Sequence, residues 1–166
     1  MNALTLNIDK RLHSILEQVS DPEIPVLTVL DMGVVRSAII DNGRVFVKIT
    51  PTYSGCPAMD VIAEDIKNVL SDAGYKAHVE LVLSPAWTTD WITEKGRQAL
   101  LKYGIAPPLN ATADKDALLG LKKLVKCTLC GSPNTRVVSQ FGSTPCKALF
   151  QCDDCNEPFD YFKCLK

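Results

Sequence analysis

Residues 34–83 read VVRSAIIDNGRVFVKITPTYSGCPAMDVIAEDIKNVLSDAGYKAHVELVL, and this stretch decides the fold of the first part of the chain. It opens with two runs rich in β-branched side chains, residues 34–40 and 44–50. Between the runs lies Asp41-Asn42-Gly43, which is typical of a tight turn because asparagine and glycine tolerate a positive φ. The pattern predicts an antiparallel β-hairpin.

The remainder of this stretch predicts a helix and a third strand. Pro57 suits the first turn of a helix and Gly74 suits a helix end, and apolar residues recur at helical spacing between them. Apolar and polar side chains then alternate over residues 77–83, as in a half-buried strand. A strand–helix–strand connection crosses over right-handed, which allows the third strand to lie parallel to a neighbour.

Two further helices complete the first domain. Helical spacing of apolar residues predicts one helix over residues 8–20. Thr93 is a good N-cap and predicts another helix that ends at Tyr103. The order of elements is α-β-β-α-β-α, so we predict a small α+β domain over residues 1–105.

The rest of the chain is interpreted as a linker and a second domain. Residues 106–126 contain two adjacent prolines and a polar stretch, which favours a linker, and a compact unit follows over 127–166. The chain has 166 residues and a formal net charge of −1, so charge alone gives no attraction to nucleic acid or to an anionic membrane. No apolar run resembles a signal peptide or a membrane span, so we expect a cytoplasmic protein.

Six of the seven cysteines lie in the second domain, and four of these form two C-x-x-C pairs. The four are Cys127, Cys130, Cys152 and Cys155. Two thiolates at this spacing can face one ion, and two such pairs complete a tetrahedron with zinc–sulfur distances of about 2.3 Å. Gly131 and Asn156 follow the pairs, and both residue types tolerate the positive φ that metal-binding turns need. We predict a closed, structural zinc site; iron in the same tetrahedron and an iron–sulfur cluster are the alternatives.

Other residues of this domain allow two interpretations each. Cys146 and Cys164 can replace a ligand or bind a second centre together with Cys56; we favour small buried hydrophobic residues. Phe159 and Tyr161 either pack the core of this small domain or form a docking surface for a partner protein.

Cys56 stands alone in the first domain, directly before Pro57 at the expected start of a helix. The helix dipole there favours a thiolate, so we expect the pKa of Cys56 to be lowered. Cys56 is then a nucleophile or a soft-metal ligand; the alternative is a buried cysteine beneath the sheet. Asp21, Glu23 and Asp31 are either exposed charges and caps or an acidic cluster beside Cys56.

Trp87 and Trp91 lie four residues apart around a short polar segment. Packing in the core is the usual role of tryptophan in such a domain. The alternative is an exposed aromatic surface that contacts a partner protein.

Three segments of the first domain resemble the iron–sulfur cluster assembly family of the MIP18 and SufT type. They are the acidic segment 21–35, the cysteine loop 50–57 and the segment 85–91, and they occur in the family's order. The resemblance implies the family's α+β fold. It also places the family's reactive cysteine on Cys56 and its acidic motif on Asp21 and Glu23, where a transient iron ion or iron–sulfur cluster would be held.

Residues 141–149 and 157–164 resemble a narrower family, the D subunits of bacterial phenylacetyl-CoA 1,2-epoxidase systems. This resemblance implies an accessory factor that matures a multicomponent oxygenase and has no catalytic activity of its own. Its clients would be the di-iron hydroxylase and the reductase, which carries a flavin and a binuclear iron–sulfur cluster.

Three other function classes stay open at this point. A scaffold subunit of the oxygenase would need no cysteine chemistry. A zinc-ribbon nucleic-acid binder is disfavoured because residues 127–166 carry four basic and four acidic side chains. A stand-alone thiol enzyme is disfavoured because the sequence places no histidine–carboxylate pair to act as its base.

Overall fold

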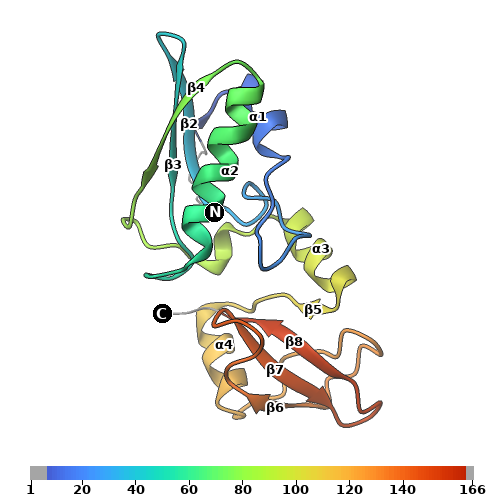
Figure 1. Cartoon of the computed structure of the whole chain (residues 1–166). Coiled ribbons are helices and arrows are strands. Elements are labelled where there is room, and N and C mark those ends of the chain that lie inside the picture. The colour runs from blue at the N-terminus through green and yellow to red at the C-terminus, as the bar shows by residue number, and fades with distance from the viewer. Residues whose placement is uncertain (1–6, 164–166) are drawn as a thin grey trace. The chain divides into compact units, whose positions relative to one another are not determined.

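The computed structural model describes residues 7–163. The chain forms two compact units, residues 1–96 and 97–166, and the boundary between them falls within helix α3 (Glu94–Tyr103) (Figure 1). Across the described range, every helix is too short or too polar to cross a membrane.

The first unit is built on a four-stranded sheet with the order β1-β2-β3-β4. Its strands are β1 (Asn7–Ile8), β2 (Val35–Asp41), β3 (Arg44–Ile49) and β4 (Lys76–Leu81). The predicted hairpin is confirmed: β2 and β3 pair antiparallel, and Asn42 and Gly43 in the turn have φ values of 47° and 75°. β4 lies parallel to β3. β1 was not predicted, because two residues are too few to show an alternating pattern.

Helices α1 (Lys10–Leu16) and α2 (Ala58–Asp72) cover one face of this sheet (Figure 1). α2 follows the prediction, but α1 ends well before Ser20. The apolar spacing suggested a longer helix because Val19 is buried although it lies beyond the end of α1, where its carbonyl accepts the N–H of Val29 at 2.9 Å. The core between sheet and helices includes Leu12, Leu16, Val45, Val47, Ile62, Ile66 and Leu70.

Thr93 begins α3, as predicted. Its hydroxyl oxygen accepts the N–H of Gly96 at 3.0 Å, and the hydroxyl donates to Asp31 Oδ1 at 2.7 Å. Asp31 is buried, and its other oxygen accepts the hydroxyl of Thr28 at 3.0 Å. Asp31 therefore ties the loop after α1 to Thr93, the cap of α3, rather than standing as an exposed charge.

The second unit has a sheet with the order β5-β8-β7-β6. Its strands are β5 (Ile105–Ala106), β6 (Thr135–Ser139), β7 (Lys147–Cys152) and β8 (Pro158–Phe162), and helix α4 (Ala111–Leu118) lies between β5 and β6 in the chain. β7 pairs antiparallel with both β6 and β8.

The predicted linker over residues 106–126 is wrong, because this segment is part of the second unit. β5 pairs parallel with β8, and α4 contributes Ala117 to the core. The Asn110 side chain caps α4 by accepting the N–H of Ala113. Buried Asp114 accepts the hydroxyl of Tyr161 at 2.6 Å. The polar residues that suggested a linker therefore hold the helix in place.

Aromatic side chains of β7 and β8 fill the core of the second unit. Phe159 and Tyr161 are 5% and 0% exposed, and their rings lie 6.0 and 5.3 Å from that of Phe150. The docking-surface interpretation of Phe159 and Tyr161 is therefore wrong: both side chains are needed inside this small unit.

Candidate metal centre and cysteine loop

The four predicted ligand cysteines converge on one point. Their sulfur atoms all lie within 4.8 Å of one another. The Cys127 and Cys155 sulfurs are 3.7 Å apart, and those of Cys130 and Cys152 are 3.6 Å apart. In a tetrahedron with zinc–sulfur bonds of about 2.3 Å, neighbouring sulfurs are about 3.8 Å apart. The spacing therefore suits one tetrahedral ion.

Each pair of cysteines sits on a tight turn that the backbone fixes. The carbonyl of Cys127 accepts the N–H of Gly131 at 3.0 Å, and the N–H of Cys152 donates to the carbonyl of Glu157 at 2.9 Å. Gly131 and Asn156 have φ values of 74° and 62°, as their positions after the pairs predicted. These turns aim both sulfurs of a pair to the same side.

The thiols of the quartet perturb one another strongly. Burial opposes ionisation of Cys127, but hydrogen bonds from the N–H groups of Cys130 and Leu129 outweigh it and lower its pKa to about 7. The N–H of Glu157 favours a thiolate at Cys155, but burial and the three neighbouring sulfurs raise its pKa to about 12. Four thiolates this close repel one another, so full ionisation requires a cation between them.

The donor set therefore fits a soft, tetrahedral metal ion. Thiolate sulfur is the ligand that such ions prefer, and all four coordination positions come from the protein. A site closed in this way leaves no coordination position for a substrate, which is the arrangement typical of structural metal sites.

Among the described residues, one further cysteine of the second unit, Cys146, is not part of the quartet. Cys146 is buried, and its sulfur lies 3.1 Å from the hydroxyl oxygen of Thr144. This agrees with the interpretation of Cys146 as a small buried residue. Cys164 lies outside the described residues.

Cys56 lies on the loop between β3 and α2, and Pro57 is the N-cap of α2. The N–H of Cys56 donates to the carbonyl of Tyr53, and its own carbonyl accepts the N–H of Met59, both at 3.3 Å. Its side chain is half-buried rather than sealed beneath the sheet. The thiol is therefore held by the loop but can still be reached.

The expected direction of the Cys56 pKa is wrong: it is raised, not lowered. Burial is the main cause, and the negative charges of Glu23 and Asp21 add to it. Hydrogen bonds from the Ala58 N–H and the Tyr53 side chain favour the thiolate but do not compensate. The N–H group at the start of α2 does lower the pKa of the sulfur, but burial raises it by more.

Asp21 and Glu23 belong to the loop that follows α1. One oxygen of buried Asp21 accepts the N–H groups of Glu23 and Ile24, each at 2.8 Å, so Asp21 shapes this loop. The negative charges of both carboxylates disfavour the Cys56 thiolate and add to the rise of its pKa. The charges of Asp21 and Glu23 thus act on Cys56, while Asp31 accepts the hydroxyl of Thr93, the N-cap of α3.

The two tryptophans have different environments. Trp87 is 5% exposed, and its indole N–H donates to the carbonyl of Met32 at 3.0 Å, so the partner-surface interpretation is wrong for Trp87. Trp91 is half-buried, with the Arg36 guanidinium 3.4 Å from the centre of its ring. Arg36 was missed, because an arginine within a strand pattern gives no sign of the ring it will cover.

Two family models match the chain, one over the part that contains Cys56 and one over the part that contains the cysteine quartet. Residues 10–81 match the model described as an iron–sulfur cluster assembly protein, and residues 111–163 match the model of the PaaD zinc beta ribbon domain. Fold and cysteine geometry therefore define a class: an iron–sulfur assembly domain joined to a four-cysteine, metal-binding ribbon.

Individual relatives narrow this class. The chain is 46% identical over 153 residues to the D component of the "Putative 1,2-phenylacetyl-CoA epoxidase" of Escherichia coli K12, covering 92% of this chain and 90% of that protein. It is 36% identical over 107 residues to an "Fe-S protein maturation auxiliary factor" of Porphyromonas gingivalis, covering 63% of this chain and 98% of that protein. A crystal structure of a domain of unknown function, DUF59, from Bacillus anthracis matches with a TM-score of 0.51 and 30% identity, over 54% of this chain and 88% of that one. The chain belongs to the PaaD family.

Proposed function

We propose that this protein is an accessory factor that helps to assemble an iron or iron–sulfur centre in a phenylacetyl-CoA 1,2-epoxidase. Its clients are the hydroxylase and reductase components of that oxygenase. Cys56 holds iron, sulfur or a cluster in passing, and the ribbon holds a structural zinc ion. The name of the Escherichia coli relative supports the link to the epoxidase, and that of the Porphyromonas gingivalis relative supports a role in iron–sulfur maturation.

The observation that carries the proposal is the half-buried thiol of Cys56 beside two carboxylates, Glu23 and Asp21. Sulfur and carboxylate oxygen are both ligands that iron accepts. Because the pKa of Cys56 is raised, the free protein keeps this thiol protonated at neutral pH, and an incoming cation must displace the proton. Competition with a proton weakens binding, which suits a ligand that must release its cargo.

Zinc in the ribbon is supported by the sulfur geometry. Four cysteine sulfurs at tetrahedral spacing, in two C-x-x-C turns, are typical of structural zinc sites. Without an ion, the second unit would depend on the small core around Phe150 and Tyr161. Metal binding is therefore the main source of its stability.

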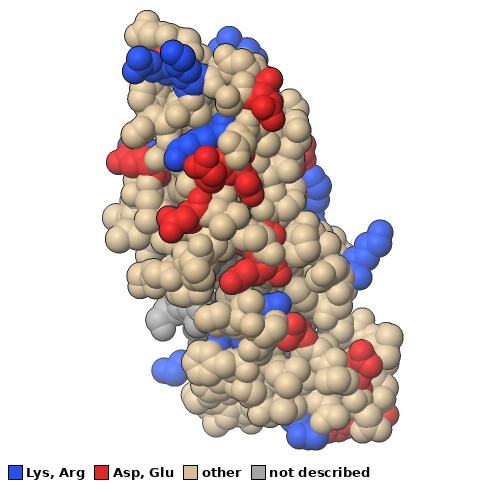
Figure 2. All heavy atoms as spheres, viewed as in Figure 1, with Lys and Arg blue, Asp and Glu red and all other residues tan. Residues whose placement is uncertain are grey.

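Surface charge gives no support to a nucleic-acid-binding role. On the face drawn in Figure 2, lysine and arginine side chains are interspersed with aspartate and glutamate. Affinity for a phosphate backbone depends on a concentrated positive surface. A protein client remains the partner that the site and the family support.

The test is the iron content of the oxygenase in cells that produce only the Cys56→Ser protein. We expect the hydroxylase or the reductase to be purified with little iron, while Cys56→Ser itself is folded and keeps its ribbon metal. Ser54→Ala, an exposed change in the same loop, is the matched control and should leave client iron normal.

Normal client iron in the Cys56→Ser cells would refute the assembly role. If the protein then co-purified with the hydroxylase in a fixed ratio, it would be a scaffold subunit instead.

A further inference from the structure

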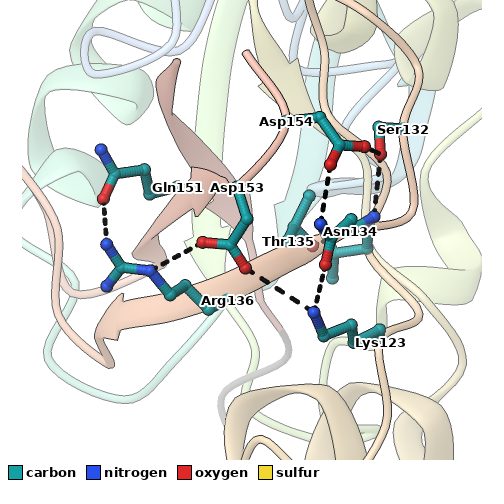
Figure 3. Close-up of polar contacts among 9 residues, drawn as sticks. Lys123, Ser132, Asn134, Thr135, Arg136, Gln151, Asp153 and Asp154 are labelled. Carbon is teal, nitrogen blue, oxygen red and sulfur yellow. Dashed lines mark hydrogen bonds and ion pairs between the residues drawn. The ribbon is translucent and has the colours of Figure 1, made fainter. Parts of the chain in front are cut away.

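A network of polar side chains on the surface of the second unit joins the segments that carry the two cysteine turns (Figure 3). Asp154 lies between Cys152 and Cys155, the second ligand pair. Its carboxylate accepts the Asn134 side-chain amide at 2.7 Å and also the hydroxyl of Ser132. Ser132 and Asn134 follow the first C-x-x-C turn, so Asp154 bonds the second turn to the end of the first.

Asp153 makes a second set of contacts. Its carboxylate accepts Arg136 Nε at 2.9 Å and lies 3.6 Å from the Lys123 ammonium, which also donates to the Asn134 side chain. Its backbone N–H donates to the carbonyl of Asn134 at 2.8 Å. Asp153 therefore ties the second turn to β6 and to the chain that leads into the first turn.

Together these contacts fix both turns without using sulfur. The N–H of Asn134 donates to the Ser132 hydroxyl oxygen at 3.0 Å, which aligns that hydroxyl for Asp154. Hydrogen bonds to a carboxylate are stronger than those between neutral groups. Outer contacts of this kind, which orient metal ligands, commonly change metal binding by a factor of about ten to a hundred.

We infer that Asp153 and Asp154 are positioning residues that latch the second cysteine turn onto the first, so that the ribbon ion is resident rather than exchangeable. The inference rests on the metal site of the proposed function and deepens it. An ion leaves such a site stepwise, as one turn swings away, and the latch opposes that movement. Iron or a cluster that passes to a client is then held at Cys56, while the ribbon keeps its own ion.

Charge alone predicts the opposite behaviour. Metal binding replaces thiol protons and leaves four thiolates around a doubly charged ion, so the site becomes more negative. A neighbouring carboxylate disfavours that change, and its removal should slow metal loss. The latch predicts that removing Asp154 speeds metal loss, so the direction of the effect decides between the two.

The experiment loads full-length protein with zinc and follows its release to an excess of a chromogenic chelator. We expect Asp154→Ala and Ser132→Ala each to release zinc about tenfold faster than the unaltered protein. The variant that combines both changes should release zinc about as fast as the faster of the two single variants, because both changes break the same hydrogen bond. Ser132→Thr keeps the hydroxyl and should restore slow release.

Glu157→Ala is the matched control, since it removes a carboxylate two residues after Cys155 that is outside the network and leaves the backbone N–H and carbonyl of residue 157 in the turn. It should release zinc no faster than the unaltered protein. Release from Asp154→Ala and Ser132→Ala at the unaltered rate, or slower, would overturn the latch while leaving the metal site intact. Protein that never binds zinc would overturn the latch and the metal site together.

Discussion

The sulfur atoms of Cys127 and Cys155 lie 3.7 Å apart, although 28 positions separate the two residues in the sequence. Cys127 and Cys155 lie on two separate turns, one before β6 and one after β7. Two thiolates this close repel each other unless a cation lies between them. The fold of this unit and its metal therefore depend on each other.

Loss of one ligand should unfold the second unit and spare the first. Cys130→Ser removes a sulfur, and structural zinc in such sites contributes on the order of 10 kcal/mol to folding. We expect metal analysis to show little zinc, and limited proteolysis to degrade residues 97–166 while residues 1–96 resist. Cys146→Ala is the control that should keep its zinc, because Cys146 is not part of the quartet. A Cys130→Ser protein with full zinc content would contradict this assignment.

Acid should release the ribbon metal. In the metal-free protein the pKa of Cys155 is about 12 and that of Cys127 about 7, so binding must expel protons. Falling pH favours the protonated thiols, and zinc affinity should therefore drop as pH falls from about 8 to about 5. Competition with a chelating dye at each pH measures this. An affinity that does not change with pH would be incompatible with thiolate ligands.

Neutralising Glu23 should make Cys56 more reactive. The negative charge of Glu23 helps to raise the pKa of Cys56, so Glu23→Gln should lower it and increase the thiolate fraction at neutral pH. We expect alkylation of the Cys56 peptide, followed by mass spectrometry, to be a few-fold faster. Asp72→Asn, at the other end of α2, should have no effect. Equal rates in Glu23→Gln and the unaltered protein would show that the carboxylate does not act on the sulfur.

The contact between Thr93 and Asp31 should stabilise the first unit. Thr93→Val removes both the N-cap of α3 and a donor to a buried carboxylate. The expected loss in free energy of unfolding is about 1–2 kcal/mol, measured by denaturant titration. Thr93→Ser retains the hydroxyl and should lose much less. Equal stability of Thr93→Val and the unaltered protein would remove the structural role given to Asp31.

Local patterns explain which features the sequence could predict. The hairpin turn at Asn42-Gly43 and the ligand quartet follow from neighbouring residues, since turn conformation and ligand spacing are local properties. β5 could not be predicted, because it is two residues long and pairs with β8, far away in the chain. The assignment of α4 to a linker failed for the same reason: its stabilising partner, Tyr161, comes from that distant strand.

The Cys56 site shows the same limit in its electrostatics. The sequence placed the thiol at a helix start, and the structure confirms that position next to Pro57. The direction of the pKa depends on burial and on Glu23 and Asp21, which approach only in the folded chain. The polar network around Asp153 and Asp154 was missed for a similar reason, since two aspartates between cysteines usually indicate only a solvated turn.

Transfer of iron in vitro tests the division of labour between the two sulfur sites most directly. The protein is purified without oxygen, loaded with radioactive iron and zinc, and mixed with metal-free hydroxylase or reductase. Iron should pass to the client from the unaltered protein but not from Cys56→Ser, while zinc stays in the ribbon of both. Equal iron transfer from Cys56→Ser, or zinc leaving the ribbon together with the iron, would contradict the proposed roles.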